Sequence, residues 1–276
     1  MRDDNCVHMP SSRGGTALAL LALLGCCCWA IVAAEPLVYV VSPHYVPGAC
    51  RAVASVRRNA AMRFEPHLLA WNARELDDVR ERWRTQCGSI LPPSRVANCS
   101  RLGFDVSLSM QDGWRGAPPR YRYLRAPHIW LRLCIVDSFP EWRDRDDALW
   151  YMDADTEVRP AIASADVVDA GAHAVCAVWD AASGMHLNSG VMRINASAWL
   201  RDDWPGRAAR EMVRDEWAND QQVLARVALA LEGGICRLDP RYNVMGLGER
   251  RHAAHSAVRD DAYVWHWTGP HKPWMY

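Results

Sequence analysis

Strand-like and helix-like segments alternate along much of this chain, and that alternation limits its fold more than any other feature. Apolar strand patterns at 37–42 and 64–71 are each followed by a helical pattern, at 49–59 and 73–85. Such repetition predicts an α/β fold with a mixed, mostly parallel central sheet flanked by helices. Further along we expect helices at 128–139 and 219–231, strands at 148–152, 174–179, 190–194 and 262–267, and an irregular Pro- and Gly-rich stretch at 92–127.

The first 34 residues predict a targeting segment. Residues 16–34 are apolar, carry no charge and are long enough to cross a bilayer. Two interpretations stay open: a cleaved signal peptide, or an uncleaved type II membrane anchor. Either one places residues 35–276, which we expect to form a single domain, in the lumen of the secretory pathway, that is, the ER or Golgi.

Charge argues against a nucleic-acid partner. The 276 residues include 32 basic and 32 acidic side chains, so the formal net charge is zero. The chain therefore lacks the excess of positive charge that is typical of proteins that bind polyanions. One basic residue is unusual, because Lys272 is the only lysine among those 32. That isolation suggests a position that needs an ammonium rather than a guanidinium group.

Six of the ten cysteines lie beyond the targeting segment, as expected for an oxidising compartment. The sequence alone cannot choose among their possible pairings. Cys87 and Cys99 flank a Pro-rich loop and are the pair we favour. Cys134 and Cys176 lie in apolar runs, which predicts small buried hydrophobic side chains.

The sharpest local signal is Asp153-Ala154-Asp155, directly after the apolar strand 148–152. Ligands of open α/β sheets bind beyond the carboxyl ends of strands. Residues two apart in an extended chain face the same way, so both carboxylates could reach one cation. Aspartates after a strand are also ordinary turn formers.

The same D-x-D pattern occurs in haloacid-dehalogenase-like phosphatases, which gives a second hypothesis. Those enzymes place Thr or Val four residues after the first aspartate. Here Glu157 occupies that position and Thr156 comes one place early. The motif also lies more than a hundred residues into the expected luminal domain, so the phosphatase ranks second.

Near the C-terminus, successive side chains of the expected strand 262–267 point to opposite faces. His266 therefore lies on the face opposite Trp265 and Trp267. A Gly-Pro turn and Lys272 follow, and Pro273 favours an extended backbone at the lysine. That arrangement suits a loop presenting an ammonium to a phosphate group.

Four motifs in this order resemble glycosyltransferase family 8: LWYMDADTEV, HLNSGVMRIN, NDQQVLARV and HWTGPHKPW. The resemblance spans residues 37–274 and implies a single GT-A domain, a Rossmann-like fold of nucleotide-diphospho-sugar transferases. It also implies that Asp153, Asp155 and His266 bind Mn²⁺, with Mg²⁺ as the alternative, and that Gly269 and Lys272 contact the donor diphosphate.

The resemblance implies further donor contacts, by Tyr45 to the base, by Arg132 to nucleotide and sugar, and by four more residues to the donor: Asp153, Ala154, Asn188 and Ser189. Arg132 could instead be a solvated helix charge. The chain departs from the family at Ser42-Pro43-His44, where an acidic or amide-bearing segment usually reads uracil. UDP as the carrier therefore rests on the resemblance alone.

By the same resemblance, Asp220 and Gln221 lie near the anomeric carbon. Their positions also fit the first turn of a helix, with Asn219 and Gln222 forming a capping box. Family membership implies retention of configuration, by front-face attack or by a covalent intermediate on Asp220.

We therefore expect a metal-dependent, retaining glycosyltransferase that moves a hexose, galactose or glucose, from a UDP-sugar to an acceptor hydroxyl. The acceptor could be a glycan, glycolipid, glycoprotein or small polyol. The alternatives are the phosphatase and a catalytically inactive sugar-binding module on the same fold. The complete set of metal ligands argues against the inactive module.

Overall fold

The computed structural model describes residues 34–60, 63–88, 95–99, 127–143, 148–159, 171, 173–179, 187–215, 218–231, 235–245, 261–268, 272 and 274. The expected targeting segment lies outside these residues, apart from Ala34. Among the helices that the structure describes, none combines the length and apolar character needed to span a bilayer.

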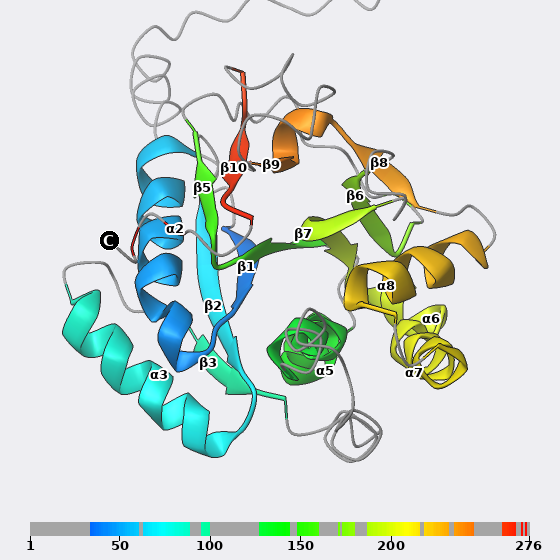
Figure 1. Ribbon diagram of the computed structural model, residues 1–276, viewed down its shortest axis with the longest axis horizontal. Helices are drawn as coiled ribbons and strands as arrows, with labels where there is room; N and C mark the ends of the chain where they lie inside the picture. The colour runs from blue at the N-terminus through cyan, green and yellow to red at the C-terminus, as the bar shows by residue number, and fades with distance from the viewer. Residues whose placement is uncertain are drawn as a thin grey trace, which may run out of the picture. The chain divides into compact units, whose positions relative to one another are not determined.

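A seven-stranded sheet forms the centre of the domain, in the order β3-β2-β1-β4-β7-β6-β8 (Figure 1). The strands are β1 (Glu35–Val40), β2 (Phe64–Ala70), β3 (Arg95–Asn98), β4 (Ala148–Asp153), β6 (Val175–Val178), β7 (Asn188–Asn195) and β8 (Cys236–Leu238). Only β7 is antiparallel to its neighbours, β4 and β6, and the other described pairings of this sheet are parallel. The expected mixed, mostly parallel sheet is confirmed.

Helices cover both faces of this sheet (Figure 1). On one side lie α2 (Val46–Asn59) and α3 (Ala73–Gln86), and on the other α5 (Ile135–Ser138), α6 (Ala196–Arg201), α7 (Trp204–Arg214) and α8 (Asp220–Leu229). Alternation along the strands supplies both cores, since Tyr39 and Trp150 pack in one buried cluster while Val38 and Tyr151 pack in the other.

A second, three-stranded sheet has the order β5-β10-β9. Its strands are β5 (Thr156–Val158), β9 (Val244–Met245) and β10 (Val264–His266), and the 3-10 helix η7 (Pro240–Asn243) leads into β9. Because β5 follows β4 after a two-residue turn, this small sheet brings the end of β10 to the carboxyl end of β4.

Several expected elements differ from the structure. The stretch expected to be irregular contains β3, which pairs in parallel with β2 and so belongs to the sheet. The expected helix 128–139 is mostly the 3-10 helix η3 (Pro127–Cys134), followed by the short α5. Pro43–Tyr45 and Pro140–Trp142 form further 3-10 turns, η1 and η4.

The expected cysteine pairing is wrong. The disulfides join Cys50 to Cys87, Cys99 to Cys134 and Cys176 to Cys236, with Cα–Cα distances of 5.7, 5.8 and 4.2 Å. Proximity in the fold decides these pairs. Helix α3 packs on α2 and carries its C-terminal end toward Cys50, while Cys99, just after β3, lies beside Cys134 of η3. Cys134 and Cys176, which we expected to be unpaired buried side chains because they lie in apolar runs, are both disulfide-bonded.

Candidate functional site

The Asp153-Ala154-Asp155 motif begins in a strand and ends in a turn. Asp153 is the last residue of β4, and the turn at 154–155 leads into β5. The Thr156 hydroxyl donates to the Asp153 carbonyl (2.8 Å), and the Trp267 amide donates to the Asp155 carbonyl (2.8 Å). A turn, rather than the extended chain we expected, therefore points both carboxylates the same way.

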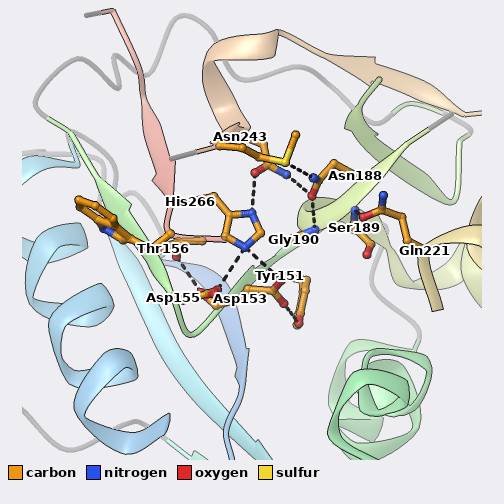
Figure 2. Close-up of polar contacts among 12 residues, drawn as sticks. Tyr151, Asp153, Asp155, Thr156, Asn188, Ser189, Gly190, Gln221, Asn243 and His266 are labelled. Carbon is orange, nitrogen blue, oxygen red and sulfur yellow. Dashed lines mark hydrogen bonds and ion pairs between the residues drawn. The ribbon is translucent and has the colours of Figure 1, made fainter. Parts of the chain in front are cut away.

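Both carboxylates face His266 at the end of β10 (Figure 2). His266 Nε2 lies 3.2 Å from Asp155 Oδ1 and 3.5 Å from Asp153 Oδ2. One ligand atom from each residue lies within 4.8 Å of the others. Two carboxylate oxygens and one imidazole nitrogen, converging in a largely buried site, form a donor set that fits a divalent cation such as Mn²⁺.

Burial and neighbouring charges shift the pKa values of the candidate metal ligands. Burial raises the pKa of Asp155, but His266 and Lys272 outweigh it and the pKa lies below its usual value. For Asp153, burial dominates over Arg132 and His266, so its pKa is raised. Burial lowers the pKa of His266, but Asp155 and Asp153 reverse the effect and the net shift is upward.

Lys272 is buried against the same motif, with a relative exposure of 4%. Its ammonium donates to Asp155 Oδ2 and to the Trp267 carbonyl. The only lysine of the chain thus lies beside the metal-ligand candidates. Gly269, predicted to act with it, lies outside the described residues.

Arg132 links the D-x-D motif to α8 and is not a solvated helix charge. Its exposure is 6%, and its guanidinium lies 2.9 Å from Asp220 Oδ2 and 3.3 Å from Asp153 Oδ1. It also donates to the Ser189 carbonyl (3.1 Å) and hydroxyl. Burial opposes its charge, but Asp220 and the other acidic neighbours raise the pKa of Arg132. Tyr151, which the sequence did not single out, donates to Asp153 Oδ1.

The N-terminus of α8 forms the next part of the site. The predicted capping box of Asn219 and Gln222 is confirmed, so Asp220 and Gln221 occupy the first turn. Gln221 Oε1 accepts from the Ser189 amide (3.3 Å), and the Ser189 hydroxyl donates to Asp220 Oδ2 (3.3 Å). These two hydrogen bonds therefore connect the first turn of α8 to the start of β7.

Asn188, at the start of β7, is 5% exposed and makes several contacts. Its Nδ2 donates to Met245 Sδ (3.1 Å), and its Oδ1 accepts from the Gly190 amide (2.9 Å) and from Asn243 Nδ2 (2.7 Å). Asn243 was missed at the sequence level, because a single asparagine after Pro-Arg-Tyr carries no motif.

A pocket of about 800 Å³ opens beside these groups. Its lining includes the predicted donor contacts Tyr45, Arg132, Asp153 and Ala154, together with Asp155. Glu75 and His128 line it as well, with Glu75 Oε2 and His128 Nε2 in contact at 2.7 Å. The pocket is large enough for a sugar nucleotide and reaches the candidate metal ligands.

Comparison with known proteins identifies relatives of this domain. The model of glycosyl transferase family 8 matches residues 36–276. The crystal structure of the galactosyltransferase LgtC with donor and acceptor sugar analogues is similar, with 21% identity, 87% of this chain and 89% of that chain covered, and a TM-score of 0.60. No curated protein sequence gives a match.

Two further structures share the fold. GlyE of Streptococcus pneumoniae TIGR4 is 15% identical over 88% of this chain and 56% of its own, with a TM-score of 0.58. Mouse xyloside xylosyltransferase 1 is 14% identical over 85% of this chain and 97% of its own, with a TM-score of 0.52. The likeness confirms the expected GT-A architecture.

Proposed function

Because this chain belongs to glycosyl transferase family 8, we propose that it is a metal-dependent, retaining enzyme that moves a hexose, galactose or glucose, from a UDP-sugar to an acceptor hydroxyl. As a member of that family the chain is a glycosyltransferase, and the phosphatase alternative loses its support. The observation that carries the finer proposal is the convergence of Asp153, Asp155 and His266 beside the pocket.

These three side chains would hold the cation, Mn²⁺ or Mg²⁺. Its chemistry would be to neutralise charge on the leaving diphosphate. Lys272 adds a second positive charge from the chain itself, because its ammonium already lies at Asp155 Oδ2. A cation is worth most to a developing negative charge where water is excluded, and Lys272 is almost wholly buried.

Asp220 is the candidate for contact with the anomeric carbon. Its carboxylate is held by Arg132 and by the Ser189 hydroxyl, at 2.9 and 3.3 Å. A carboxylate fixed in this way supports either a covalent intermediate or charge stabilisation during front-face attack. Trapping of a glycosylated Asp220 would select the first route, and retained activity in Asp220→Ala would select the second.

The proposed setting is the lumen of the secretory pathway, on a glycan, glycolipid, glycoprotein or small polyol acceptor. The three disulfides support this setting, because such bonds persist in oxidising compartments.

Donor hydrolysis by the purified protein tests the proposal. UDP-glucose, UDP-galactose, UDP-xylose and UDP-galacturonate are offered with Mn²⁺ and with a chelator, and UDP release is measured. We expect release from one donor in the presence of Mn²⁺, and its loss with the chelator and in Asp155→Asn.

The matched control is Asp202→Asn, which removes a surface ion pair with Arg201 (2.9 Å) and should leave UDP release intact. Full activity of Asp155→Asn without metal would contradict the ligand assignment. Phosphate release from phosphomonoesters would favour the phosphatase, and no release from any substrate would favour the inactive module.

A further inference from the structure

Asn243, the last residue of η7, has a fully buried side chain between two residues of the site (Figure 2). Its Oδ1 lies 2.9 Å from His266 Nδ1, and its Nδ2 lies 2.7 Å from Asn188 Oδ1. None of the roles assigned above falls on it. It contacts Nδ1 of the His266 ring, while the two aspartates lie at Nε2.

The orientation of the whole chain of contacts follows from one backbone group. The Gly190 amide can only donate, and it donates to Asn188 Oδ1 at 2.9 Å. That oxygen therefore faces Asn243, which must present its own donor, Nδ2. Asn243 then turns its oxygen toward His266, and a carbonyl oxygen can only accept.

We propose that Asn243 is a positioning residue that keeps the proton of His266 on Nδ1, so that Nε2 offers its lone pair to the metal ion. The inference rests on the proposed metal site, because Nε2 is the nitrogen that lies 3.2 and 3.5 Å from the two aspartates. A neutral imidazole binds metal through one nitrogen while the other donates to a fixed acceptor.

The backbone of Gly190 confines the ring from another direction. A Cβ atom built on Gly190 would lie 2.6 Å from His266 Nδ1 and 3.0 Å from Asp153 Oδ2, too close for any side chain. The ring is therefore packed against β7 while Asn243 holds its Nδ1. Contact and hydrogen bond together fix both the position and the tautomer of His266.

Metal affinity of the purified protein tests the first consequence. Binding of Mn²⁺ is measured by the electron paramagnetic resonance signal of the free ion, without donor or acceptor. Asn243→Leu, similar in size but without an acceptor, should bind Mn²⁺ about 10- to 100-fold more weakly. Asn243→Asp keeps the acceptor and should lie closer to the wild type than Asn243→Leu does.

Asn195→Ala is the matched control. Asn195 is also a buried asparagine, 7% exposed, but it caps α6 at the other end of β7. Its loss should lower Tm and leave Mn²⁺ affinity unchanged. Equal affinities of Asn243→Leu and wild type, or equal losses in Asn243→Leu and Asn195→Ala, would overturn the proposal.

A second readout needs neither metal nor activity. In metal-free protein with ¹⁵N-labelled histidine, Nδ1 of His266 should carry a proton, because it faces the Asn243 oxygen at 2.9 Å. Asn243→Leu should lose the proton on Nδ1 and keep one on Nε2, which faces Asp155 at 3.2 Å. A wild-type Nδ1 without a proton would refute the role of Asn243. If the wild type binds no divalent cation, the metal-dependent function fails, yet this measurement still decides the role of Asn243.

Discussion

Lys272 shows how far a single residue can be understood from sequence. Its isolation among arginines and its distance from His266 predicted a role beside the site, and the structure places its ammonium at Asp155. Asn243 could not be found in this way. Its contribution depends on the orientation of two amides and on a backbone amide 53 positions earlier, at Gly190, and no local pattern encodes that.

Lys272→Arg should impair transfer although it conserves the charge. A planar guanidinium is larger than an ammonium and has five N–H donors, which need more acceptors than Asp155 and the Trp267 carbonyl provide in this buried space. We expect turnover to fall by roughly 10- to 100-fold, approaching the loss in Lys272→Met, which lacks the charge. Wild-type kcat in the arginine variant would show that the lone lysine is an accident of composition.

His67 on β2 should make stability sensitive to acid. Burial is the largest effect and lowers the pKa of His67, and Arg95 lowers it slightly further. Glu65 and Glu141 raise the pKa of His67, but the net shift is downward. The unfolded chain then binds more protons than the folded one as pH falls below the ordinary value of 6.5. The free energy of unfolding should therefore decrease as pH falls through that value toward the lower folded pKa.

Urea denaturation at pH 7.5, 6.5 and 5.5 tests this prediction. His67→Phe suits the surroundings, since His67 packs edge-on against Phe139 and Trp142. The phenylalanine variant should show a shallower dependence over the same range. Parallel pH profiles for the two proteins would mean that His67 is not the responsible group.

At the scale of elements, a disulfide helps to fix the position of η3. Arg132 lies in this 3-10 helix, and Cys134, two residues later, is bonded to Cys99, which directly follows β3. A 3-10 helix has weaker hydrogen-bond geometry than an α-helix. The disulfide therefore contributes to holding Arg132 against Asp153 and Asp220.

Replacing both Cys99 and Cys134 with serine should reduce stability and activity together. A loop of 35 residues corresponds to about 3–4 kcal/mol of unfolding free energy, and a loosened Arg132 should also lower kcat. The matched control is the double serine variant of Cys50 and Cys87, which opens a loop of 37 residues between α2 and α3. It should lose similar stability but keep kcat near wild type, and equal kcat losses would argue against a specific role for the η3 disulfide.

Sequence predicted the central strands well because each is a strong apolar run, as in β1, β2 and β4. The two-residue β9 and the three-residue β5 and β8 are too short for any periodicity, and their pairing is decided by partners far along the chain. The helices α6 and α7 were also missed. The four motifs, by contrast, were sufficient for the family and the fold, because their order reflects the whole domain.

For the whole molecule, divalent metal should raise the temperature of unfolding. An ion that binds the folded site and not the unfolded chain stabilises by about 2.7 kcal/mol at a hundred times its Kd. Scanning calorimetry with Mn²⁺ and with a chelator should show a clear difference in Tm for the wild type. The difference should vanish in Asp155→Asn, and its persistence there would place the ion elsewhere.

The two sheets meet at the candidate metal site, since Asp153 ends β4 of the large sheet and His266 ends β10 of the small one. An ion bound to Asp155 and His266 would join residues separated by 266 − 155 = 111 positions, more than the sequence separations of 35, 37 and 60 between the bonded cysteines. Such an ion would act as a dissociable cross-link between the sheets. The concentration of available metal would then set the lifetime of the folded state as well as the rate of turnover.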